Sequence, residues 1–119
     1  ESLKELYADK YIAFAMRPNR VKQRDIWDLY WLDLQGVRVD VALLCDKLDD
    51  RAIAVPEFKE SLSQRIAGLS SGFQDFHTEL SRFLPAALVD KVLAQPGYWE
   101  LLTGSMEQGA SVILERLSD

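Results

Sequence analysis

The spacing of apolar residues along the chain predicts helices from one end to the other. Ser2 and Glu5 fit a capping box, in which the serine hydroxyl accepts a hydrogen bond from an amide of the first turn, so a helix should begin at Leu3. Apolar residues then recur at steps of three and four, which gives this helix one apolar face. Proline disfavours the helical conformation in the residue before it, so Pro18 should end the helix at Arg17.

A second helix should run from residue 21 or 22 to residue 34 or 35. It is apolar on nearly all sides, which is the pattern of a buried helix. Two acidic residues interrupt this pattern, and their spacing of three places Asp25 and Asp28 on one face. Arg24 can pair with Asp28 across one turn.

Five further helical segments are predicted by the same period. Asp40 is a suitable N-cap for the first of them, and Pro56 and Pro85 fit the first turns of two others. The segments should end at about Asp49, at the break between Gly68 and Gly72, at Phe83, at Gln95 and at Leu117. No strand signal is longer than three residues. The pattern therefore predicts an all-α fold, with six or seven helices packed as a compact bundle without a sheet and a single domain over residues 1–119.

The composition is that of a soluble domain with one core. Of the 119 residues, 48% are hydrophobic and 28% are charged, and no apolar run is long enough to cross a membrane. Cys45 is the single cysteine, and its apolar neighbours at helical spacing indicate a small core residue. A lone cysteine of this kind is typical of a reducing compartment, so we expect a cytoplasmic protein with no membrane partner.

Positive charge is concentrated at the turn between the first two helices, although the net charge is -5. Arg17, Arg20, Lys22 and Arg24 fall within a segment, residues 17–24, that contains no acid. The net charge argues against a general nucleic-acid-binding protein, whereas this turn indicates a local site for an anion.

Lys10 is the most unusual residue of the first helix, because it lies near the middle of the apolar face and needs a partner. In a structural interpretation, Lys10 pairs with one aspartate of the second helix and Arg24 with the other. In a functional interpretation, Lys10 contacts a phosphate group, while Asp25 and Asp28 orient it or hold a metal ion or a hydroxyl. A site charged on both sides suits a nucleoside triphosphate with its magnesium ion.

No other set of residues in the sequence offers catalytic chemistry. There is no Gly-rich phosphate loop, no Cys/His cluster with metal spacing, and no Ser or Cys nucleophile placed with a histidine. His77 lies on an apolar stripe, and we interpret it as a core or boundary residue. The aromatic residues at helical spacing are interpreted as core rather than as base-stacking platforms, and they are Trp27, Trp31, Phe73, Phe76 and Phe83.

Two stretches resemble the C-terminal portion of the AbiEii/AbiGii toxin family of nucleotidyltransferases. In the first, residues 2–17, the letters ADK at residues 8–10 are followed by alanines at 13 and 15, and this resembles the lysine motif of the family. The second reads RDIWDL at residues 24–29 and resembles the R-D-x-x-D-L motif. The order and short spacing of the two motifs also match, and residues 36–119 agree as a helical extension of similar kind.

The resemblance implies an enzyme of the polymerase-beta-like nucleotidyltransferase superfamily that acts as the toxin of a toxin–antitoxin or abortive-infection system. In such proteins an N-terminal α/β lobe carries a Gly-Gly-Thr or Gly-Ser motif and a D-x-D pair that binds magnesium. By the same resemblance, Lys10 would contact the triphosphate, with Arg24 and Arg17 also binding the nucleotide. Asp25 and Asp28 would be catalytic residues.

The sequence departs from the family pattern because it contains neither a Gly-Gly-Thr motif nor a D-x-D pair. We therefore expect the chain to be the C-terminal part of a longer nucleotidyltransferase, without a metal site of its own and inactive alone. Magnesium and a nucleoside triphosphate would be cofactors of the longer protein. Its expected partners are the missing N-terminal lobe, a cognate antitoxin and an acceptor RNA such as tRNA.

A different class of function is open on the sequence alone. The chain could be a non-catalytic helical module that docks an antitoxin or another partner protein. The docking surface would then be the acidic face formed by Asp46, Asp49 and Asp50.

Overall fold

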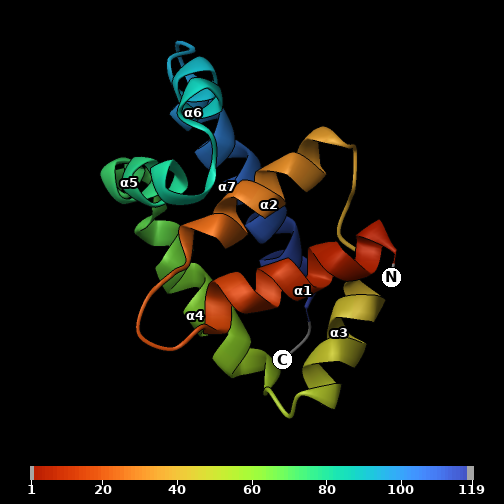
Figure 1. The fold of residues 1–119 in the computed structure, drawn as a ribbon. Helices are drawn as coiled ribbons and strands as arrows, with labels where there is room; N and C mark the ends of the chain where they lie inside the picture. The colour runs from red at the N-terminus through yellow and green to blue at the C-terminus, as the bar shows by residue number, and fades with distance from the viewer. Residues whose placement is uncertain (1, 118–119) are drawn as a thin grey trace.

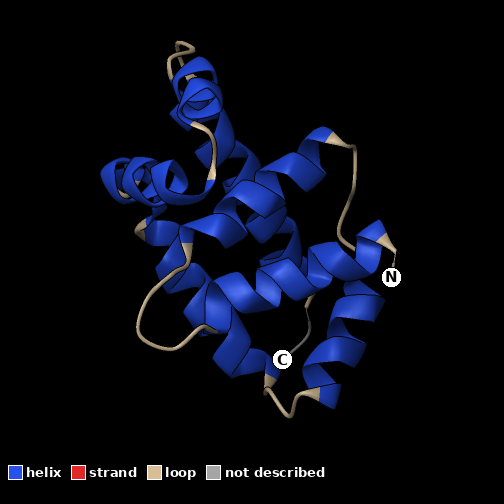
Figure 2. Ribbon diagram, in the orientation of Figure 1, coloured by secondary structure: helices blue, strands red, loops and turns tan. Residues whose placement is uncertain are grey.

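Helices account for the regular secondary structure in the part of the chain that is described (Figures 1 and 2). The structure is a computed structural model, which describes residues 2–117 apart from the side chains of residues 92 and 93. The elements are α1 (Leu3–Met16), α2 (Gln23–Leu34), α3 (Val41–Asp50), α4 (Val55–Ala67), the short 3-10 helix η1 (Leu69–Ser71), α5 (Phe73–Phe83), α6 (Ala86–Leu93) and α7 (Tyr98–Arg116). Over residues 2–117 there is no strand, and the predicted all-α fold is confirmed.

Local capping chemistry places the ends of the helices close to where the sequence predicts them. The Ser2 hydroxyl accepts a hydrogen bond from the backbone N–H of Glu5 at 3.1 Å, and α1 begins at the next residue after the cap. Asp40 caps α3 in the same way, accepting from the N–H of Leu43 at 3.1 Å. The predicted break after α4 is confirmed as well, because the chain there forms only the single turn of η1.

The first helix lies at the centre of the arrangement. Figure 1 shows α1 and α2 side by side and running in opposite directions, and α1 also packs against α3 and α4. α7 packs against α2 and α4 from the other side. The largest fully buried side chains come from six of the helices, and they include Tyr11, Phe14, Leu29, Leu44, Phe58, Phe76 and Leu102. This single core holds α1 and α2 in a fixed relation to each other.

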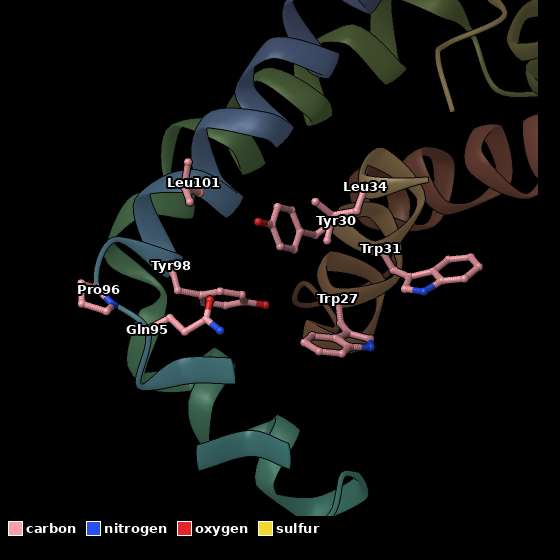
Figure 3. A pocket seen from close by; sticks show the side chains of 8 residues that line it. All are labelled: Trp27, Tyr30, Trp31, Leu34, Gln95, Pro96, Tyr98 and Leu101. Carbon is pink, nitrogen blue, oxygen red and sulfur yellow. The ribbon is translucent and has the colours of Figure 1, made fainter. Parts of the chain in front are cut away.

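The prediction that α2 is buried on all sides is wrong. Leu29 and Leu32 are fully buried, but Trp31 is 46% exposed and Leu34 is 65% exposed. These exposed side chains line a groove of about 350 Å³ between α2 and the start of α7 (Figure 3). The difference arises because the packed helices cover the part of the apolar surface of α2 that carries the two leucines, which belong to the core, and leave the part that lines the groove open.

Two aromatic residues of α5 are also more exposed than the sequence predicts. Phe76 is fully buried, whereas Phe73 is 36% exposed and Phe83 is 41% exposed. The exposed rings lie at the two ends of α5, where Phe73 contacts Trp99 of α7 and Phe83 lies beneath the guanidinium group of Arg24 on α2. His77 is half-buried beside Phe73, which confirms the prediction of a boundary residue.

Cys45 is a free, partly buried thiol that packs against the core. Of the helices that the structure describes, none combines the length and the hydrophobicity that a membrane span needs.

Candidate functional site

The residues of the two sequence motifs meet where α1 and α2 run antiparallel. The ammonium nitrogen of Lys10 lies 2.8 Å from Oδ2 of Asp28 and 3.5 Å from Oδ1 of Asp25. One lysine on α1 therefore bridges both aspartates, which share a face of α2 because they are separated by three residues. The structure brings together the lysine of one motif and the two carboxylates of the other.

Arg17 completes this arrangement at the end of α1. Its Nε lies 2.6 Å from Oδ2 of Asp25 and its Nη2 lies 3.2 Å from Oδ1, so the guanidinium donates to both carboxylate oxygens. The hydrogen bond to Asp25 raises the pKa of Arg17 above its ordinary value, with a smaller opposing effect from burial. We refer to Lys10, Arg17, Asp25 and Asp28 as the charged cluster.

The four members of the charged cluster differ in their exposure to solvent. Asp25 is only 1% exposed, and a carboxylate buried to that extent is stable when cations and hydrogen bonds compensate for lost water. The side chains of Lys10, Asp28 and Arg17 are 23%, 29% and 35% exposed. The carboxylate of Asp25 is therefore shielded from solvent. The other three members, two cations and one carboxylate, can be reached by solvent.

Chemically, the exposed members can bind an anion and accept a hydrogen bond. An ammonium group has three donors, and two of those of Lys10 are directed to carboxylates in the described part of the chain. One N–H therefore remains for an incoming oxygen. Asp28 has a single cationic partner among the described residues, so it keeps lone pairs that can accept from a hydroxyl or a water.

Arg24 does not join the charged cluster. Its guanidinium carbon lies over the ring of Phe83 on α5, 5.7 Å from the ring centre, in a cation–π contact. The predicted pairing of Arg24 with Asp28 is wrong, because Asp28 pairs with Lys10 of α1 while Arg24 contacts Phe83 of α5. A helix wheel places the two residues within reach, but it gives no information about the partner that another helix supplies.

The basic turn is less available to an anion than its charge suggests. Arg20 forms an ion pair with Glu79 of α5, and the same carboxylate accepts a hydrogen bond from the backbone N–H of Gln23 at 3.3 Å. Arg17 is engaged by Asp25. Lys22 and Arg24 are the two members of the turn for which the described residues supply no ion pair, and both are exposed.

Arg65 of α4 holds the backbone next to the charged cluster. This residue was not identified from the sequence. Its two terminal nitrogens donate to the backbone oxygens of Phe14 at 2.8 Å and Arg17 at 2.5 Å. These carbonyls belong to the end of α1, where helical hydrogen bonds run out, so Arg65 fixes the backbone from which Arg17 extends. Nothing in the sequence near either residue indicates a contact between positions so far apart.

Asp33, one turn beyond the cluster on α2, was also missed. It accepts hydrogen bonds from the hydroxyls of Tyr7 on α1 and Ser105 on α7. Burial, together with this hydrogen bond, raises the pKa of Tyr7. The interface of α1 and α2 is therefore crossed by polar contacts at successive turns, from Tyr7–Asp33 through Lys10–Asp28 to Arg17–Asp25.

The charged cluster alone does not have the composition of a magnesium site. Magnesium is bound by carboxylate and other oxygen ligands that are free to coordinate it, and here both aspartates already face cationic side chains. Within residues 2–117 no group of three or more His, Cys, Asp or Glu residues is placed to hold a metal ion. The chemistry that the cluster offers is anion binding by its two cations, Lys10 and Arg17.

The acidic face of the alternative interpretation is present on α3. Asp46, Asp49 and Asp50 are exposed, as the helical pattern predicts. The neighbouring basic residues of the same helix and its end, Lys47 and Arg51, are engaged with Asp9 of α1 at 3.1 and 2.7 Å. Exposure alone does not identify a partner for this face.

Comparison with known proteins agrees with the motifs that form the cluster. No curated protein and no solved structure matches the chain. A family model described as nucleotidyl transferase AbiEii toxin, type IV toxin–antitoxin system, matches residues 1–112. Because this match covers nearly the whole chain, the protein belongs to the AbiEii nucleotidyl transferase toxin family.

Proposed function

We propose that the charged cluster is the helical wall of a nucleotide-binding site in a nucleotidyltransferase toxin. The observation that carries the proposal is that Lys10, Arg17, Asp25 and Asp28 come from two separate motifs and meet in one partly exposed cluster. A cluster with two cations that solvent can reach suits a triphosphate, whose oxygens need several positive partners.

In this proposal Lys10 is the residue that contacts the triphosphate. Its free N–H is directed to a phosphate oxygen, while Asp25 and Asp28 hold the ammonium group in place. Fixing a lysine before the substrate arrives reduces the entropy that must be lost on binding. Arg17 contributes its remaining exposed N–H groups to the same anion, since Asp25 occupies only one side of the guanidinium.

The two aspartates have different roles in the proposal. Asp25 is buried beneath Arg17 and acts as a positioning residue. Asp28 is the carboxylate that can touch a substrate, because it is partly exposed and has one cationic partner in the described chain. An acceptor hydroxyl beside Asp28 would donate its proton to that carboxylate as the hydroxyl oxygen attacks the α-phosphorus, and pyrophosphate would leave with the electrons of the broken P–O bond. Arg24 has no contact in the described structure that supports a role at the cluster.

The rest of the transferase site would come from polypeptide outside these 119 residues. The carboxylates that bind magnesium in such enzymes would lie there, together with the Gly-Gly-Thr or Gly-Ser segment. The toxin–antitoxin family membership supports a cognate antitoxin as a partner of the system. An RNA acceptor, such as tRNA, and a cytoplasmic location belong to the same proposal.

The test is nucleotide transfer by the complete protein that contains this chain. Lys10→Met should lower kcat/KM for the nucleotide by about 100-fold or more, the usual loss when one transition-state donor is removed. Lys91→Met, an exposed lysine on α6, is the matched control and should retain activity. Equal activity of the two variants would refute the proposal, as would the absence of any nucleotide transfer by the wild-type protein.

A further inference from the structure

A second cavity opens at the other end of the interface between α1 and α2. It holds about 470 Å³, within the size range of small-molecule sites, and lies between the start of α1, the end of α2 and the outer side of α7. Its lining includes Tyr7, Asp33, Arg38, Ser105, Gln108 and Arg116. None of these six residues belongs to the charged cluster, so this cavity is a separate feature of the fold.

Asp33 supplies a fixed acceptor in the wall of the cavity. Both of its oxygens already accept a hydroxyl hydrogen, one from Tyr7 and the other from Ser105. These donors come from α1 and α7, so the carboxylate is held in one orientation from two sides. Each carboxylate oxygen can accept more than one hydrogen bond, which leaves capacity for a hydroxyl group of a ligand.

Two arginines in the lining of the same cavity offer donors for an anion. Arg38 donates one hydrogen bond, from Nη1 to the backbone oxygen of Val37 at 3.0 Å, and neither Arg38 nor Arg116 has a carboxylate partner among residues 2–117. Both side chains are exposed and line the cavity. In a chain of net charge -5, two arginines without a carboxylate partner at one cavity form a local positive site.

We propose that this cavity binds a free sugar phosphate, with Asp33 accepting from sugar hydroxyls and Arg38 and Arg116 binding the phosphate. Guanidinium groups match phosphate oxygens with paired, charge-assisted hydrogen bonds. A phosphate alone would leave Asp33 without a ligand donor and close to a negative charge. A sugar alone would leave the two arginines unused. The ligand that satisfies both ends carries hydroxyls and a phosphate on one small molecule.

The experiment is a calorimetric titration of the protein with three probes: ribose 5-phosphate, inorganic phosphate and ribose. Ribose 5-phosphate should bind most tightly. Arg38→Gln and Arg116→Gln should each weaken its binding about tenfold or more, because each removes a charge-assisted contact. Arg82→Gln is the matched control, since Arg82 is an exposed arginine of α5 outside this cavity, and it should bind as the wild type does.

Three outcomes would overturn the inference. The first is no binding of ribose 5-phosphate, and the second is equal binding of ribose 5-phosphate and inorganic phosphate. The third is an equal loss of affinity in Arg82→Gln, which would indicate a general charge effect. Asp33→Asn should reduce the preference for ribose 5-phosphate over inorganic phosphate. If this variant does not fold, the two arginine variants still test the inference. Because no cluster residue is altered, the result does not depend on the proposed nucleotidyl transfer.

Discussion

Arg17 donates to both carboxylate oxygens of Asp25, at 2.6 Å through Nε and at 3.2 Å through Nη2. The carboxylate is buried, while the guanidinium that covers it is partly exposed. Breaking the pair costs most free energy at Asp25, because water cannot reach the groups left without a partner at this buried position. Asp25 and Asp28 therefore contribute differently to stability although they belong to one motif.

Replacing each aspartate in turn separates the two contributions. Asp25→Ala should lower the free energy of unfolding by about 1–3 kcal/mol, a value reduced from that of a fully buried pair because Arg17 is partly exposed. Asp28→Ala should lower it by about 0–1 kcal/mol, as for an exposed ion pair. Urea unfolding measures both, and equal losses would show that the burial of Asp25 has no energetic consequence.

Two glycines of α7 give a test of the packing beneath α1. A Cβ at Gly109 would lie 2.3 Å from the hydroxyl oxygen of Tyr11, whereas a Cβ at Gly104 meets nothing within 4 Å. Tyr11 cannot move freely, because it is fully buried and donates to the backbone oxygen of Met106 at 3.2 Å. Gly109→Ala should therefore destabilise the fold by about 1–3 kcal/mol through overpacking.

Gly104→Ala is the matched control in the same helix. It should stabilise the protein by about 0.5–1 kcal/mol, because alanine has the higher helix propensity and the site is open. Thermal unfolding of both variants measures the difference. Stabilisation by both substitutions would contradict the close approach of Tyr11 to α7.

The buried tyrosines predict a loss of stability in alkali. Burial is the main cause that raises the pKa of Tyr7, Tyr11 and Tyr98 in the folded protein. The folded state therefore holds these protons more tightly than the unfolded state, in which tyrosine has a pKa of about 10. The contribution of the three groups to the free energy of unfolding is constant below about pH 10 and falls as the pH rises further.

Urea unfolding at a series of pH values above about pH 9 measures this loss. Tyr7→Phe removes one of the titrating groups, so its stability should fall less steeply than that of the wild type. The variant should also be less stable near neutral pH, because Asp33 loses the Tyr7 hydroxyl as a donor. Identical alkaline slopes for the variant and the wild type would contradict the burial of the Tyr7 hydroxyl.

The elements that could be predicted from the sequence are those determined by neighbouring residues. The caps at Ser2 and Asp40 depend on backbone groups three residues away, and both are present. The meeting of Lys10 with Asp25 and Asp28 was also within reach, because a short turn joins α1 and α2 and a lysine on an apolar face needs a partner.

The features that were missed depend on contacts between distant parts of the chain. Arg24 stacks on Phe83, and Arg65 caps the end of α1, through packing that no local spacing indicates. The hydrogen bonds of Asp33 to Tyr7 and Ser105 join three helices. The exposure of Trp31 could not be predicted either, because apolar periodicity shows which faces are apolar but not which of them another helix covers.

The most direct test of the account asks which lysine lies beside a bound triphosphate. An acyl-phosphate derivative of a nucleoside triphosphate transfers its acyl group to a lysine amine next to the terminal phosphate, forming an amide and releasing the nucleotide. With the complete protein, mass spectrometry should find the acyl group on Lys10, and excess unmodified nucleotide should suppress it. Labelling of exposed Lys91 with no suppressible labelling of Lys10 would contradict the assignment of the charged cluster as a nucleotide site.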